Sequence, residues 1–181
     1  VDARHLYGIH WWGHSPGAPV DPTPKSLLDV PEYSAWDTEI VLTHDSSMAA
    51  GNFVDLFQTL YNWNVSIITR IDYRWGETLP SPSRPEYATW GQSIVNAINQ
   101  LADWCHIWVI GNEPNVTVEA TGWPESKIQP SDYATVYRNV RNYIRANARV
   151  GAAGPHLVLI AGPSPGPAMG VRWMAGTDYL D

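Results

Sequence analysis

The sequence predicts a single α/β domain, residues 1–181, whose strands run parallel, and three observations lead to this fold class. The chain has 181 residues, which is the length of one domain and enough to bury a core. Short apolar stretches alternate along it with longer segments whose apolar residues recur at helical spacing. The short stretches are almost wholly apolar, as expected of parallel strands that are covered on both faces.

The expected elements follow one another as strand, loop, strand, helix, strand, helix, strand, helix and strand. Strands are expected at residues 6–13, 39–45, 65–73, 107–114 and 156–166. Residues 14–34 read as a long irregular loop with one short helix near Ser26. Ser46 and Ser47 would cap the first main helix, and Ser131 the last. Helical spacing runs from Phe53 to Trp63, from Tyr87 to Leu101, and from Tyr133 to Ile144. No linker or repeat divides the chain.

Polar and aromatic side chains gather where the expected strands end. In βα barrels and in open doubly wound sheets, the loops after these ends build the active site. In the third strand, Arg70 and Asp72 lie on the face opposite Ile71, and charges on one face suit a wet barrel mouth. The alternative is an Arg70–Asp72 ion pair that only closes the barrel top.

Composition excludes several partners. The net charge is −7 and the 11 Lys and Arg are scattered, so a nucleic-acid partner is not expected. The apolar runs are too short for a membrane span. The 10 Trp and 9 Tyr stand beside only 2 Phe. Trp and Tyr combine a flat apolar face with a hydrogen-bonding edge, which is the chemistry that a sugar ring requires.

The segment IGNEPN, residues 110–115, resembles the acid/base motif of the clan A glycoside hydrolases, which are (β/α)8 retaining enzymes. Three other segments resemble parts of that barrel in the expected order. FVDLFQTLYNWNVSIITRIDY resembles the segment from helix two to strand three, PSDYATVYRNVRNYIRA the helix after the acid/base loop, and HLVLIAGPSP the fifth strand. The resemblance covers most of the chain and implies hydrolysis of O-glycosidic bonds in a poly- or oligosaccharide. Retaining hydrolysis needs two carboxyl groups about 5–5.5 Å apart.

The resemblance makes Glu113 the general acid/base, and Asn112 would hydrogen-bond the 2-hydroxyl of the substrate. Pro114 would stop the strand. The other expected contacts with the carbohydrate lie at strand ends or on the loops that follow: Trp11, Trp12, His14, His44, Asp45, Arg70, Asp72, Tyr73, Trp75 and Trp123. Of these, the Trp and Tyr side chains are the expected stacking platforms. Trp36, Trp63, Trp90 and Trp104 would pack on or beside helices, and Trp108 would lie in the core. No cofactor and no metal are expected.

The chain departs from the clan pattern at the nucleophile, which in the clan is a Glu at the end of the seventh strand. The expected strands stop after the fifth, whereas a full barrel takes about 250 residues. The sequence therefore predicts a partial barrel whose open edge a missing C-terminal segment or self-association would cover. Glu119 and Glu125 lie on the same loop as Glu113. If Asp45 or Asp72 substituted, an inverting separation of about 6.5–9.5 Å would be expected.

Two other functions stay open. A partial barrel with Trp-lined loops would bind a glycan without cleaving it if no nucleophile is supplied. A metal-dependent hydrolase is the second alternative, because five possible ligands fall near strand ends: His10, His14, His44, Asp45 and Asp72.

Overall fold

The structure is a computed structural model, and it describes residues 8–9, 35–164 and 174. Five parallel strands form one sheet in the order β1-β2-β3-β4-β5. They are β1 (Gly8–Ile9), β2 (Trp36–Leu42), β3 (Ser66–Asp72), β4 (Ile107–Ile110) and β5 (Leu157–Ile160). The order in space equals the order in sequence, so each new strand joins the same edge. A doubly wound sheet instead reverses its order at a switch point.

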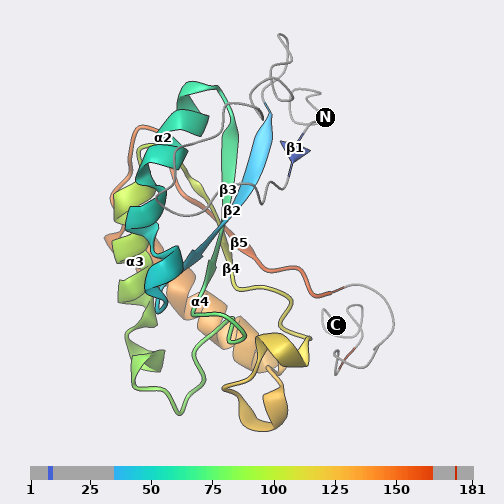
Figure 1. Ribbon diagram of the computed structural model, residues 1–181. Helices are drawn as coiled ribbons and strands as arrows, with labels where there is room; N and C mark the ends of the chain where they lie inside the picture. The colour runs from blue at the N-terminus through green and yellow to red at the C-terminus, as the bar shows by residue number, and fades with distance from the viewer. Residues whose placement is uncertain (1–7, 10–34, 165–173, 175–181) are drawn as a thin grey trace.

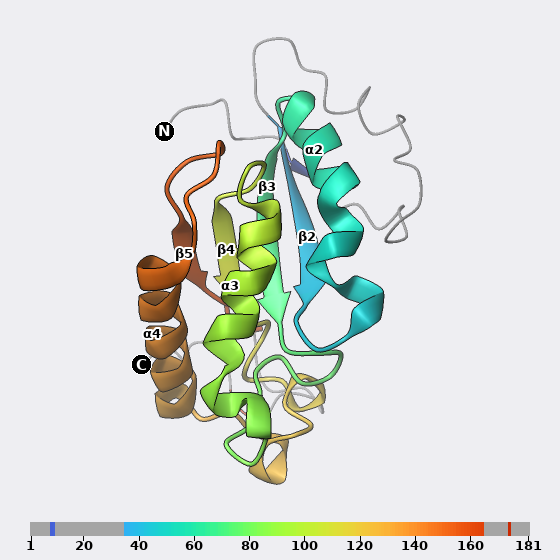
Figure 2. The same ribbon diagram turned by 90° about the vertical axis from the view of Figure 1, so that its left-hand side faces the viewer.

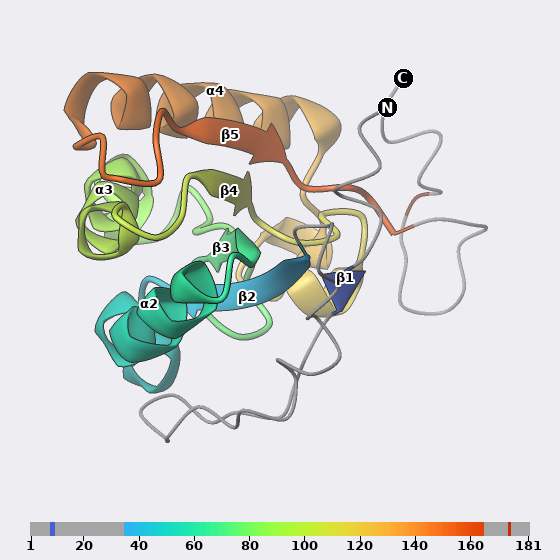
Figure 3. The same ribbon diagram turned by 90° about the horizontal axis from the view of Figure 1, so that it is seen from above.

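In the described part of the chain, three α-helices connect β2 to β5: α2 (Val54–Asn62), α3 (Trp90–Leu101) and α4 (Pro130–Asn147). Figure 3 shows the strands as a curved wall with these helices along its outer side, and Figure 2 shows the helices in front of the sheet. Among the described residues, helices therefore cover one face of the sheet and not both. Short 3-10 turns complete the connections: η2 (Ser46–Met48), η3 (Ala50–Phe53), η4 (Pro85–Ala88), η5 (Thr117–Glu119) and η6 (Pro124–Ser126).

The core lies between the helices and the sheet. Its completely buried side chains include Phe53, Phe57, Leu60, Ile71, Ile94, Ile98, Trp108 and Ile144. Alternation along β3 sends Ile67 and Ile71 into this core, while Ile68 and Arg70 lie on the other face and are half-buried. The predicted two faces of this strand are confirmed, as are the core position of Trp108 and the packing of Trp63, Trp90 and Trp104. Trp36 differs, because it is the first residue of β2.

Several predicted boundaries were wrong, and local hydrogen bonds explain why. The second strand ends at Leu42, since the Asp45 carboxylate accepts from the Ser47 N–H and starts η2. Asp45 therefore caps η2, and the N-cap of α2, Phe53, makes no side-chain capping bond, so the predicted serine cap of this helix was wrong. The last helix begins at Pro130, and its N-cap Gln129 makes no side-chain capping bond. The fourth strand ends at Ile110 and the fifth spans only four residues.

The remaining expectations for the N-terminal region, residues 10–34, lie outside the described residues, as does the tail of the fifth predicted strand beyond residue 164. Of the first predicted strand, Gly8 and Ile9 pair with Trp36 and Asp37 of β2. Among the described helices, none combines the length and apolar character that crossing a membrane requires.

Candidate active site

The described polar residues that the sequence assigns to a site lie at the ends of β2, β3 and β4 or in the loops that follow. Figure 2 shows that these strands end on the same side of the sheet. Backbone hydrogen bonds hold neighbouring ends together: the His44 N–H donates to the Tyr73 carbonyl at 2.9 Å, and the Gly111 N–H to the Ile71 carbonyl at 2.9 Å. The structure thus brings together the ends of β2, β3 and β4. Trp11, Trp12 and His14 lie outside the described residues.

Glu113 occupies a sharp turn immediately after β4. Gly111 has φ of 84°, and a Cβ there would lie 3.1 Å from the Thr78 hydroxyl oxygen. Glu113 itself has φ of 33°, in the left-handed region that costs a non-glycine residue about 1–3 kcal/mol. Its side chain is half-buried, and no hydrogen bond or ion pair joins its carboxylate to another described residue. Such strain persists only where surrounding contacts enforce it.

Two side chains from other elements form hydrogen bonds that hold the end of β4 in place. The Thr78 hydroxyl accepts from the Asn112 N–H and donates to Asp72 Oδ1 at 3.1 Å. On the other side, the Tyr133 hydroxyl of α4 donates to the Ile110 carbonyl at 2.7 Å and accepts from the Ala161 N–H. The end of β4 is therefore fixed to the loop after β3 and to the end of β5.

Asn115 adds a third constraint on the same loop. Its side chain is completely buried. Its amide accepts from the Ser164 N–H at 2.8 Å and donates to the carbonyls of Ser164 and Met174, both at 3.0 Å. A single side chain thus joins the loop that carries Glu113 to the chain beyond β5. The sequence pattern does not single out Asn115, Thr78 or Tyr133, because their partners are far away in sequence.

Asp72 is a buried carboxyl group at the end of β3. Only 2% of it is exposed, and the Arg70 Nε lies 2.9 Å from its Oδ2. Burial raises the pKa of Asp72 to about 7, the nearby Glu119 carboxylate adds to the rise, and Arg70 and the Thr78 hydroxyl oppose it. The predicted alternative of an Arg70–Asp72 pair is present.

Asn112 uses its side chain within the same network. Its Nδ2 donates to Glu119 Oε1 at 3.0 Å. The Glu119 backbone carbonyl in turn accepts from the Thr78 N–H at 2.8 Å. Glu119 was expected only as a loop carboxylate, and the structure places it beside the residue that precedes Glu113.

His44 and Tyr73 form a separate aromatic cluster. Their ring centroids are 4.6 Å apart, and the Tyr73 hydroxyl donates to Glu86 Oε2 at 3.1 Å. Burial lowers the pKa of the His44 imidazole, the Glu86 carboxylate opposes this change, and the Arg74 guanidinium adds to it. The Asp45 carboxylate is used in the η2 cap, where two hydrogen bonds from Ser47 lower its pKa.

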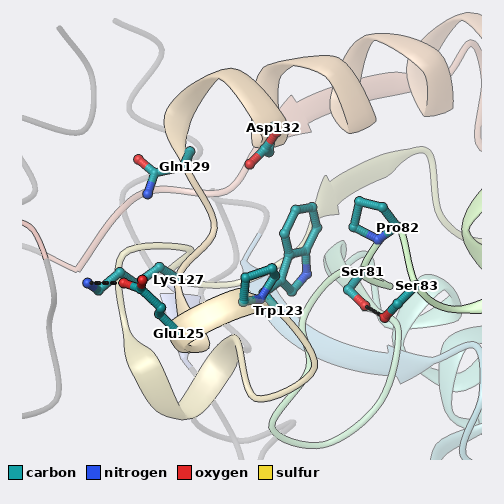
Figure 4. Close-up of a pocket in the computed structure, with 9 residues that line it drawn as sticks. Ser81, Pro82, Ser83, Trp123, Glu125, Lys127, Gln129 and Asp132 are labelled. Carbon is teal, nitrogen blue, oxygen red and sulfur yellow. Dashed lines mark hydrogen bonds and ion pairs between the residues drawn. The ribbon is translucent and has the colours of Figure 1, made fainter.

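The two remaining tryptophans have different surroundings. Trp75 is 50% exposed, so its ring is open to solvent. Trp123 is 5% exposed, and its indole N–H donates to the Leu79 carbonyl at 2.9 Å. Part of its ring faces a cavity of about 550 Å³ that Figure 4 shows. The other lining residues are Ser81, Pro82, Ser83, Pro124, Glu125, Lys127, Gln129 and Asp132.

This cavity does not include Glu113, Asn112 or Asp72. We place the candidate site at the strand ends, because the strained acid and its fixed neighbours lie there. Within the described part of the chain, no three His, Cys, Asp or Glu side chains are arranged to hold a metal ion. His10 and His14 lie outside that part, so the metal-dependent alternative is not tested.

Comparisons with known proteins bear on the fold. The sequence matches no protein-family model, and no curated protein matches it. A solved structure of a fungal β-1,4-galactanase superimposes with a TM-score of 0.54 at 14% identity, covering 86% of this chain and 53% of that one. The chain thus spans about half the length of that enzyme. At this identity the likeness concerns the fold alone, an α/β fold with a glycosidase barrel as its neighbour.

Proposed function

We propose that this chain is the acid/base-bearing part of a glycoside hydrolase that cleaves O-glycosidic bonds by a retaining mechanism. One observation carries the proposal: Glu113 lies at the end of the fourth parallel strand, in a strained turn held by neighbouring elements. The galactanase-like fold supports it, since strand ends are where βα barrels place catalytic groups.

The proposed chemistry needs a proton donor and a nucleophile. Glu113 would give its proton to the departing glycosidic oxygen while a second carboxylate attacks the anomeric carbon. Glu113 would then take a proton from the water that releases the sugar from the covalent intermediate. Asn112, directly before it, would hydrogen-bond the sugar hydroxyl next to the anomeric carbon. The exposed ring of Trp75 offers a stacking surface for a neighbouring sugar.

The described carboxylates around Glu113 are committed to other contacts. Asp45 caps η2, Asp72 is buried against Arg70, and Glu119 bonds Asn112. We propose that the nucleophile comes from a polypeptide segment that pairs with β5, either a further part of the chain or a second copy. In support, three of the four β5 side chains are exposed aliphatics: Leu157, Leu159 and Ile160. An apolar edge strand of this kind invites a further strand.

The test uses the protein joined with its β5-pairing segment, and it measures hydrolysis of 4-nitrophenyl β-glycosides and of polysaccharides. It begins with β-1,4-galactan because the structural neighbour is a β-1,4-galactanase. Glu113→Gln should lower kcat/KM by about 10²–10⁴-fold, the usual contribution of a positioned acid/base. Glu125→Gln, on the same loop and paired with Lys127 at the surface, is the matched control. The loss should be largest for the polysaccharide and smaller for the 4-nitrophenyl glycosides, because their acidic phenol leaving group needs less proton donation. Equal activity of Glu113→Gln and wild type would refute the assignment.

Binding without cleavage is the second candidate, favoured by those committed carboxylates. Calorimetric titration with β-1,4-galactan oligosaccharides distinguishes the two. Heat of binding without product, in the protein joined with its β5-pairing segment, would identify a carbohydrate-binding module.

A further inference from the structure

We infer that Glu119 is a positioning residue: it fixes the side-chain amide of Asn112 so that Oδ1 is presented to a hydroxyl of the substrate. This inference rests on the proposed function and deepens it. It assigns a role to a carboxylate that the resemblance leaves without one. The substrate class that it selects is a glycoside with a hydrogen-bond donor beside the scissile bond.

The geometry begins with the backbone. Thr78 is completely buried, and its hydroxyl and its N–H hold Asn112 and Glu119 separately. Its hydroxyl accepts from the Asn112 N–H, and its N–H donates to the Glu119 carbonyl at 2.8 Å. These two bonds to Thr78 fix the backbones of Asn112 and Glu119 relative to each other, independently of the contact between their side chains. The 3.0 Å contact between Nδ2 and Oε1 follows from that placement.

Charge then decides the orientation of the amide. The amide turns its Nδ2 toward Glu119 Oε1, since the carboxylate oxygen is the acceptor of this hydrogen bond. Oδ1 is left on the opposite side, together with the second Nδ2 hydrogen. A turned-over amide would place Oδ1 against Oε1, two acceptors in contact. A hydrogen bond to an ionised acceptor is also stronger than a neutral one, which holds the amide in a single orientation.

The alternative is that the Asn112–Glu119 hydrogen bond only stabilises the loop between β4 and η5. The two roles differ in what they predict. If the pair only stabilises the loop, its loss should lower kcat/KM for all substrates alike. If it orients Asn112, its loss should matter only for a substrate that has the hydroxyl that Asn112 recognises. A substrate without that hydroxyl separates them, because the site then gains nothing from the amide.

The first measurement needs no activity. In ¹⁵N spectra of the 181-residue chain, the Asn112 side-chain signal is identified by its loss in Asn112→Asp. Glu119→Ala should move it toward the position of a solvent-exposed amide and speed its hydrogen exchange, Glu119→Gln should do so partially, and Glu125→Ala should leave it unchanged. An unchanged Asn112 signal in Glu119→Ala would overturn the inference, whatever the protein's activity.

The second measurement uses 4-nitrophenyl β-D-galactopyranoside and its 2-deoxy counterpart. Glu119→Ala should lower kcat/KM for the parent glycoside about 10-fold, the value of one hydrogen bond, and change the 2-deoxy substrate less than about 2-fold. The effects of Glu119→Ala and Asn112→Ala should not add. Equal losses of kcat/KM on both substrates would show that Glu119 only stabilises the loop and does not position Asn112. A wild type that neither cleaves nor binds any glycoside would instead overturn the proposed function, and with it the substrate role of Glu119.

Discussion

The loops after β2 and after β4 both follow parallel strands and both carry carboxylates, yet their side chains are held differently. After β2, the Thr43 hydroxyl donates to the Asp72 carbonyl 29 positions away, but the side chains that follow bond locally. Asp45 bonds Ser47 two positions away, and Asn52 donates to the Ser46 carbonyl six positions away. After β4, the Asn112 N–H bonds the Thr78 side chain 34 positions away, and the Asn115 side chain bonds Ser164 49 positions away. Local bonds shape only their own turn, whereas distant bonds fix a turn relative to the sheet. A catalytic group needs the second kind of support.

The largest expected effect concerns Asp72, whose pKa is raised where that of Asp45 is lowered. Folded Asp72 keeps its proton up to about pH 7, but the unfolded chain loses it near 3.8. The native state therefore binds more protons in this window, so the free energy of unfolding should fall as pH rises through it and level above pH 7. The contribution is up to about 4 kcal/mol. Urea titrations of wild type and Asp72→Asn between those pH values measure it.

Asp72→Asn should flatten this part of the stability curve. Asp45→Asn should change the curve in the opposite sense, because a lowered pKa gives stability that is lost on acidification. An unaltered slope in Asp72→Asn would mean that the carboxyl is not buried as described.

Asn115→Ala should lower the free energy of unfolding by about 3 kcal/mol, because the buried N–H and carbonyl of Ser164 lose their partner. Asn52→Ala, which removes two bonds within an exposed loop, should cost less than about 1 kcal/mol. Urea denaturation compares the two. Similar losses of unfolding free energy in the two variants would show that the two loops are held equally firmly.

Thr78→Val keeps the shape of the side chain but removes the bonds to Asp72 and to Asn112. We expect the free energy of unfolding to fall by about 2 kcal/mol, because two groups lose their hydrogen-bond partner. We also expect kcat to fall by more than this loss of stability explains. The control is Thr59→Val, whose hydroxyl bonds the Asp55 carbonyl within α2. A kcat that matches the control would show that Thr78 does not position the site.

Asp45→Ala should have the smallest effect, a loss of stability below that of Thr78→Val, because the cap lies on an exposed 3-10 turn. Thermal unfolding measures it. If KM rises more than tenfold while stability barely changes, Asp45 contacts the substrate, as the sequence predicts, and the loop after β2 belongs to the site.

The element order, the two faces of β3 and the position of Glu113 after an apolar strand were all predictable. Hydrophobic periodicity is a local property, and the strand-end motif lies within six residues, IGNEPN. Boundaries were less predictable: Asp45 and Gly111 ended strands earlier than apolar content indicated, through a cap and a positive φ.

The sequence by itself determined which segments form strands and helices and which acid follows the fourth strand. Only the tertiary structure decided that Asp72 is desolvated, that Asn115 holds the chain beyond β5, and that Glu119 faces Asn112. Desolvation and hydrogen bonding depend on distances through space between residues far apart in the chain, and spacing along the chain does not encode those distances.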